Sequence, residues 1–235
     1  MSAPSVRHTL ALGLAGSLLA LAGCSDDAAP AGGGDDPQQA LDAAKQTLDE
    51  TSGVRLSLAT EALPSGVSAV KSAEGVGTHA PAFDGTLTVV LGAAEFDVPV
   101  VALDGVVHAQ VPLTPGWQEV DPAEYGAPDP AQLMATEDGF SSLLTATEGL
   151  ETGDSVRGGQ NNEEVLTEYT GTVAGDVVGN VIPSASGDFD ATYTITDGGE
   201  LRTAVLTGVF YPGTEPMTYT VDLSEYGSEP DITAP

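Results

Sequence analysis

This chain of 235 residues has few cysteines and histidines, the residues that most often bind transition metals. There is one cysteine, Cys24, and His79 and His108 are the histidines that follow it. Because no H-x-x-x-H spacing occurs and no second cysteine exists, a transition-metal site is not favoured. Asp188 and Asp190 fit solvated turns better than calcium ligands, since no EF-hand pattern surrounds them.

Catalytic patterns are equally scarce. The chain has no G-x-S-x-G sequence, no P-loop and no dinucleotide-binding fingerprint. Its 35 acidic residues leave room for a carboxylate pair of the kind that hydrolyses glycosides, but no pair stands in a context that singles it out. We therefore expect no enzyme, no metal and no cofactor.

Cys24 lies where an apolar run meets a polar stretch. The run from Thr9 to Leu21 follows Arg7, is too short to span a bilayer comfortably, and ends in Leu21-Ala22-Gly23-Cys24. These four residues resemble the lipobox of bacterial lipoproteins, in which the cysteine becomes lipid-modified and then the mature N-terminus. We predict a lipoprotein signal peptide over residues 1–23 and a lipid anchor on Cys24. An ordinary cleaved signal or a chance apolar segment is the alternative.

A lipid anchor would hold the protein at the extracytoplasmic face of the cell membrane without spanning it. Removal of residues 1–23 takes away Arg7, so 6 − 1 = 5 basic residues remain against 35 acidic ones. So acidic a chain is not expected to bind nucleic acid, because phosphate contacts require Lys and Arg. Without a second cysteine, no internal disulfide is expected either.

Residues 24–36 are rich in Ala, Gly, Pro and Asp, which is typical of a flexible tether. We expect a single domain over residues 37–235, large enough to bury a sizeable core. Asp36-Pro37 is a typical helix start, an acceptor side chain followed by proline at the first helical position. Leu41, Ala44 and Leu48 then recur at helical spacing on one side.

The stretch from Phe83 to Trp117 has the clearest alternation of apolar and other residues. Two turns, at 92–94 and at Asp104-Gly105, divide it into three segments. This pattern predicts a three-stranded antiparallel meander with one apolar face. Further alternating segments, at 54–58, 165–170, 189–196, 201–209 and 217–223, predict more strands, and 62–79 is interpreted as a hairpin arm.

Short helices are predicted between these groups of strands. Asp129-Pro130 would start one, Asp138 would cap another, and a third would end before Pro183. Since each has an apolar side, we expect them to pack on the meander. The apolar residues that would meet there come from the meander as a floor (Leu87, Val89, Leu91, Phe96, Val98, Val100, Val107, Ala109, Val111) and from the helices as a roof (Leu133, Met134, Phe140, Leu143, Leu144, Val178, Ile182). Such residues can form a closed core or line a cavity.

An ordered set of short sequences resembles the LppX/LprA/LprF/LprG lipoproteins of mycobacteria and relatives. The set comprises Leu91-Gly92 with Phe96-Asp97, Leu103-Asp104-Gly105, Trp117, Asp129-Pro130-Ala131-Gln132-Leu133 and Gly159-Gln160-Asn161, besides the lipobox. The resemblance implies an α+β fold, a curved antiparallel half-barrel sheet with helices packed on its concave face. It also implies an apolar cavity between sheet and helices, lined by the residues above.

In that case the protein would bind acyl chains of a lipid or triacylated glycolipid and carry them across the cell envelope, with an envelope exporter as a partner. Strands of ten residues span about 33 Å, enough to cover an acyl chain along its length. A different class of function remains open, that of a surface lipoprotein with a solid core that scaffolds or modulates another envelope protein. The volume of any cavity distinguishes the two, because a scaffold is packed at ordinary interior density.

Overall fold

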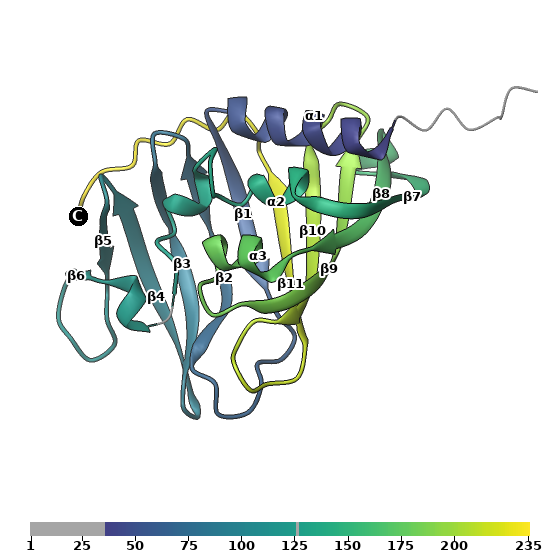
Figure 1. Ribbon diagram of the computed structural model, residues 1–235. Helices are drawn as coiled ribbons and strands as arrows, with labels where there is room; N and C mark the ends of the chain where they lie inside the picture. The colour runs from purple at the N-terminus through teal and green to yellow at the C-terminus, as the bar shows by residue number, and fades with distance from the viewer. Residues whose placement is uncertain (1–35, 126) are drawn as a thin grey trace, which may run out of the picture. The chain divides into compact units, whose positions relative to one another are not determined.

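One open antiparallel sheet organises the domain (Figure 1). The computed structural model describes residues 36–125 and 127–235, and within them eleven strands belong to this sheet. The predicted signal peptide, Cys24 and all of the predicted tether except Asp36 lie outside the described residues. The helices and strands, in chain order, are α1 (Pro37–Glu50), β1 (Gly53–Ala59), β2 (Ala69–Thr78), β3 (Ala82–Leu91), β4 (Ala94–Leu103), β5 (Val106–Ala109), β6 (Gln118–Val120), η1 (Pro122–Tyr125), η2 (Gln132–Met134), α2 (Ser142–Thr145), β7 (Thr147–Gly158), η3 (Gln160–Asn162), β8 (Glu164–Val173), α3 (Gly175–Val181), β9 (Ser186–Thr196), β10 (Leu201–Val209) and β11 (Met217–Ser224).

The strand order is β6-β5-β4-β3-β2-β1-β11-β10-β9-β8-β7. Neighbouring strands are consecutive in the chain except at the centre, where β1 pairs with β11. Strands β6 and β7 follow each other in sequence but lie at opposite edges of the sheet. Residues 121–146 must therefore cross the width of the sheet, and this crossing segment holds η1, η2 and α2.

The predicted meander is confirmed. Strands β3, β4 and β5 pair antiparallel, with Leu87 opposite Val98 and Val100 opposite Ala109. Asp104 and Gly105 both have positive φ in the tight turn between β4 and β5, a conformation that Asp and Gly tolerate. The region interpreted as a hairpin arm supplies β2, which pairs with both β1 and β3.

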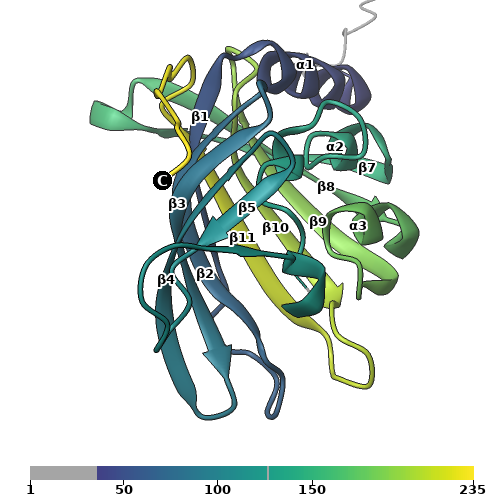
Figure 2. The ribbon, with the colours of Figure 1, turned by 90° about the vertical axis from the view of Figure 1, so that its left-hand side faces the viewer.

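Helix α1 begins as predicted. The Asp36 side chain accepts a hydrogen bond from the Gln38 main-chain N–H at 3.1 Å, and Pro37 occupies the first helical position. Its apolar side buries Leu41, Ala44 and Leu48. This side faces α2, β7 and β10, and α3 packs on β9. Figures 1 and 2 show α1, α2 and α3 on the same side of the sheet.

Two helices predicted in the crossing segment are present but do not start where the sequence predicted. The helix predicted after Asp129 is a single 3-10 turn, although the Asp129 carboxylate does accept from the Ala131 N–H at 2.9 Å. Asp138 has φ 58° and caps no helix; α2 starts later, at Ser142, and is one turn long. Helices this short gain little from their own hydrogen bonds, so packing decides their extent. Helix α2 also does not pack on the meander as expected, since it contacts α1 and α3 instead.

The buried core extends from Leu41 to Leu223, and partly buried residues up to Tyr226 pack against it. All of these residues belong to one compact unit, residues 34–235. This part of the chain thus contains its own complete core and can fold as a unit. Among residues 36–125 and 127–235, no helix combines the length and the apolar character needed to cross a membrane.

Candidate functional site: an apolar cavity

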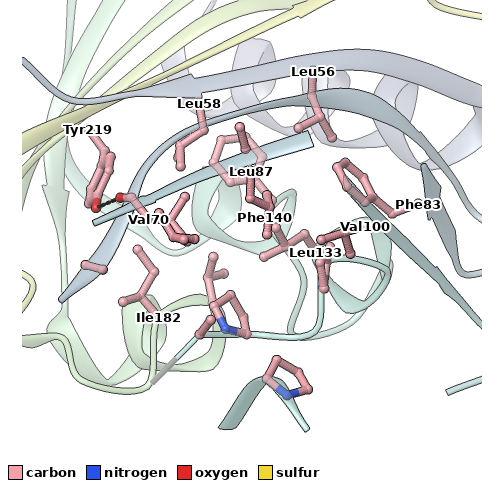
Figure 3. Close-up of a pocket in the computed structure, with 18 of the residues that line it drawn as sticks. Leu56, Leu58, Val70, Phe83, Leu87, Val100, Leu133, Phe140, Ile182 and Tyr219 are labelled. Atoms are coloured by element: carbon pink, nitrogen blue, oxygen red, sulfur yellow. Dashed lines mark hydrogen bonds between the residues drawn. The ribbon is translucent and has the colours of Figure 1, made fainter. Parts of the chain in front are cut away.

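A cavity of about 470 Å³ lies between the sheet and the crossing segment. Its sheet side comes from β1 to β6 and from β10 and β11, and its other side from the crossing segment, α3 and Leu48 of α1. In Figure 3, Leu87, Phe83 and Val100 of the sheet lie near Leu133 and Phe140 of the crossing segment. The volume falls within the range of about 300–1,000 Å³ that is usual for small-molecule sites.

Most of the residues that the sequence predicted for such a cavity line it. They are Leu87, Val89, Leu91, Val98, Val100, Val107, Ala109 and Val111 from the meander and the residues after it, and Leu133, Met134, Phe140, Val178 and Ile182 opposite. Alternation on the strands brings the first group together, because every second side chain faces the same side.

Leu143, Leu144 and Phe96 do not line the cavity. Both leucines are fully buried in α2, which directly precedes the edge strand β7 and packs between α1 and α3. They therefore belong to the closed core beside β9. Phe96 is half-buried on a part of β4 beyond the last pair with β5, Val100 with Ala109, so β4 has no outer neighbour there.

The sequence reasoning missed the contribution of the two central strands. Leu56 and Leu58 of β1 line the cavity and lie directly opposite Leu223 and Val221 of β11, which line it too. Alternation in β1 and β11 is as regular as in the meander and could have indicated a shared apolar face. What the sequence does not reveal is that strands more than 150 residues apart are neighbours.

Glycines make room for the aromatic floor of the cavity. Gly75 and Gly85 lie opposite each other on β2 and β3. A Cβ atom added to either would come within 2.6 Å of the Phe83 ring, which is 1% exposed and lines the cavity. The ring can thus lie close against the sheet backbone, since neither strand has a side chain beneath it.

The two ends of the cavity differ in exposure. At one end, next to the turn between β3 and β4, Leu91 is 46% exposed. At the other end, Leu48, Phe83 and Ser141 are all buried. Phe83 and Leu91 are separated by about 26 Å of extended strand. The cavity is therefore a long space that is open to solvent near Leu91 and closed near α1.

The tyrosine hydroxyl groups on the cavity wall form hydrogen bonds within the protein. Tyr219 donates to the Val70 carbonyl at 2.5 Å, drawn as the dashed line in Figure 3. The Tyr211 hydroxyl lies 2.9 Å from that of Tyr219 and, because the Tyr219 proton is already engaged, acts as the donor. Burial, and then Tyr211, raise the pKa of Tyr219, so its phenol stays protonated and keeps this bond.

Among the described residues that line the cavity, the ionisable side chains other than tyrosine are His79 and Glu124. The lining is otherwise mostly aliphatic and aromatic, with proline at several positions of the crossing segment. An apolar ligand would exchange water for this lining, with about 25 cal/mol for each Å² of apolar area removed from water. The arrangement can thus hold an apolar molecule without reacting with it.

Two solved structures share this architecture. LprF from Mycobacterium bovis matches with a TM-score of 0.69 and 15% sequence identity, over 85% of this chain and 96% of that chain. The Mycobacterium tuberculosis lipoprotein LppX matches with a TM-score of 0.62 and 15% identity, over 84% of this chain and 98% of that one. At such identities the likeness shows the fold alone. A search of curated proteins gave no match.

The sequence also matches a protein-family model over nearly all of the described residues. The model describes the LppX_LprAFG lipoproteins and covers residues 36–232, which includes every element from α1 to β11. The resemblance noted from short sequences is thereby confirmed, and this chain belongs to the LppX_LprAFG lipoprotein family.

Proposed function

We propose that this protein binds acyl chains of lipids or glycolipids in the apolar cavity and carries them across the cell envelope. The observation that carries the proposal is the cavity itself, about 470 Å³ of space with an almost wholly apolar lining. Closed cores are packed at the density of organic crystals and leave few voids larger than a water molecule. A space of this size argues against the alternative of a solid-core scaffold.

In this proposal the sheet is a curved half-barrel, and the helices together with the crossing segment cover its concave face. The signal peptide of residues 1–23 would direct export, and lipid on Cys24 would anchor the domain at the extracytoplasmic face of the membrane through the tether. Transfer then consists of removing chains from one membrane and releasing them elsewhere, with an envelope exporter as a partner. It needs no covalent step.

Filling the cavity tests this function. Residues 36–235 are purified from an actinobacterial host, and organic extracts are analysed by mass spectrometry. We expect a stoichiometric diacyl or triacyl species in the wild type and its loss in Leu87→Trp, because the larger side chain would occupy the cavity.

The matched control is Thr86→Trp, one residue earlier on β3, where the side chain is exposed. This variant should retain the lipid. Wild-type protein that is free of lipid and stable, or a Leu87→Trp variant that is folded and still fully loaded, would overturn the proposed function or its location.

A further inference from the structure

His79 has one ring nitrogen for which none of the described residues supplies a partner. Its Nε2 lies 2.6 Å from the main-chain oxygen of Leu48, at the end of α1. A carbonyl oxygen only accepts, so Nε2 must carry the proton, and in the neutral ring Nδ1 is then an acceptor. Among the described residues, Nδ1 is the buried side-chain polar atom for which no protein group serves as a partner.

The His79 side chain belongs to the closed end of the cavity. His79 lines the cavity and follows β2 directly, past the pair of Thr78 with Ala82. Its neighbours in sequence and register place it beside Phe83 and Leu48, at the end opposite Leu91. Burial of an acceptor without a donor is unfavourable, so such a group in a native protein calls for a donor from outside the protein, which a water molecule or a ligand can supply.

The other polar side chains at this end already have partners within the protein. The Ser141 hydroxyl donates to the Asp49 carboxylate at 2.6 Å and accepts from Lys45 Nζ at 3.3 Å. Lys45 also donates to the Thr136 carbonyl at 2.8 Å and forms an ion pair with Asp49. All three protons of its ammonium group are thus engaged.

No lysine or arginine among the described residues lines the cavity. Besides Lys45, basic side chains of this part of the chain are held in ion pairs: Arg55 with Glu225, Lys71 with Glu95, and Arg202 with Glu164 and Glu200. Arg157 lies on β7, at the far edge of the sheet, and lines no part of the cavity. A phosphate drawn into the closed end would therefore be a buried anion without a counter-charge, which is strongly unfavourable.

We propose that the cavity selects an uncharged acyl lipid whose hydroxyl group donates a hydrogen bond to Nδ1 of His79. The lipid lies with its polar end against α1 and its chains extending toward the open end at Leu91. A free hydroxyl on a glycerol backbone has the required chemistry. This inference rests on the proposed function, since it names the class of lipid that the same cavity takes.

Three lipids with the same two acyl chains distinguish the requirement for a hydroxyl donor from the requirement for an uncharged lipid. They are 1,2-dioleoylglycerol, with a free hydroxyl; its 3-acetate, uncharged but without the donor; and dioleoylphosphatidic acid, which is anionic. Delipidated residues 36–235 are titrated with each in competition with one fluorescent fatty acid. We expect about five- to tenfold tighter binding of dioleoylglycerol than of the acetate, the usual value of one hydrogen bond. Phosphatidic acid should bind about a hundredfold more weakly than dioleoylglycerol.

His79→Leu should make the affinities for dioleoylglycerol and the acetate equal. Binding of the acetate by the variant serves as an internal control, because it shows that the cavity is intact even though the Leu48 carbonyl has lost its partner. His79→Gln, whose amide can still donate to that carbonyl, provides a second variant if His79→Leu unfolds. It keeps an acceptor and should retain part of the preference.

Equal binding of dioleoylglycerol and the acetate by the wild type overturns the role of Nδ1, as does a preference that survives in His79→Leu. Phosphatidic acid that binds as tightly as dioleoylglycerol overturns the selection for uncharged lipids. In each of these outcomes acyl binding itself persists, so the proposed function stands. Failure of all three lipids to bind, with no lipid copurifying, overturns the proposed function and the inference with it.

Discussion

The two halves of the sheet are both built of antiparallel strands joined by turns, but their interiors differ. The half that contains β7, β8 and β9 packs against α1, α2 and α3, and none of its strands lines the cavity. There the buried side chains fill the space: Leu41, Leu143, Leu144, Val173, Phe189, Tyr193 and Leu201 have no exposed surface. The half that contains β2 to β5 instead faces the crossing segment, and the space between them stays open.

The difference lies in what covers each half. Helices present closely spaced side chains that interdigitate with a sheet. The crossing segment has only single turns and carries Pro122, Pro128 and Pro130 along the cavity, so it bridges the sheet without filling the space beneath. A row of aromatic rings joins the halves, with Phe210 at 4.8 Å from Phe189 and 4.9 Å from Tyr219 between ring centroids.

Truncation of one leucine in each half tests this comparison most strongly. Leu143→Ala should lower the free energy of unfolding by about 3–4 kcal/mol, because it opens a void in a filled core. Leu87→Ala should lower it by about 1 kcal/mol, since this side chain borders space already and forfeits fewer contacts. Urea denaturation of delipidated residues 36–235 measures both. Equal losses would mean that the cavity half is as tightly packed as the other.

Adding a methyl group at a glycine should also affect the stability of the two halves differently. A Cβ at Gly208 would clash with the Phe189 ring, which is fully buried and cannot move aside. Gly208→Ala should therefore lower the free energy of unfolding by about 1–3 kcal/mol and leave lipid uptake unchanged.

Gly77→Ala is its counterpart in the cavity half. The new Cβ would meet Met134 Cγ at 2.5 Å, but this flexible side chain lines the cavity and can move into it. We expect less than about 1 kcal/mol of lost stability, together with weaker uptake of lipid in the competition titration. Unchanged uptake with a large loss of stability would contradict the view that the cavity absorbs the added volume.

Alkaline pH should affect the closed half through Tyr193. Burial raises the pKa of Tyr193 to about 12 from 10.0, even though a hydrogen bond with Thr147 acts in the opposite direction. The folded phenol thus stays protonated at pH values where the unfolded one ionises. Its contribution to stability is complete below pH 10 and is lost as the pH rises through 12, with a loss of about 1 kcal/mol at pH 11.

Tyr193→Phe removes the ionisable group, so the variant should lack this part of the loss of stability at alkaline pH. The difference in free energy of unfolding between wild type and variant, measured by urea denaturation from pH 9 to 11, should shrink as the pH rises. A difference that does not change with pH would show that Tyr193 ionises alike in both states. The decline that remains in the variant is attributed to Tyr219 and Tyr226, whose pKa values burial also raises.

Much of the sheet could be predicted from the sequence because alternation is a local signal. The meander, the last three strands and the cap at Asp36 are all encoded within a few residues of where they form. The pairing of β1 with β11 has no such local signal, and it brings Leu206, Tyr219, Val221 and Leu223 into the cavity wall. The helices predicted after Asp129 and Asp138 start later than predicted and are single turns, because apolar residues at helical spacing also suit single turns that cross a sheet.

Strand β7 was missed for a reason that follows from its position. It lies at an edge of the sheet, and nearly all of its side chains are exposed, so it has no alternation to detect. Its register with β8 shifts between Glu148 and Glu151 and again between Thr152 and Ser155, and it carries acidic residues and glycines along its length. Irregular, charged edges resist pairing with a strand of another molecule. The register shifts, acidic residues and glycines that made β7 hard to predict thus also disfavour edge-to-edge polymerisation of copies of this protein at this edge.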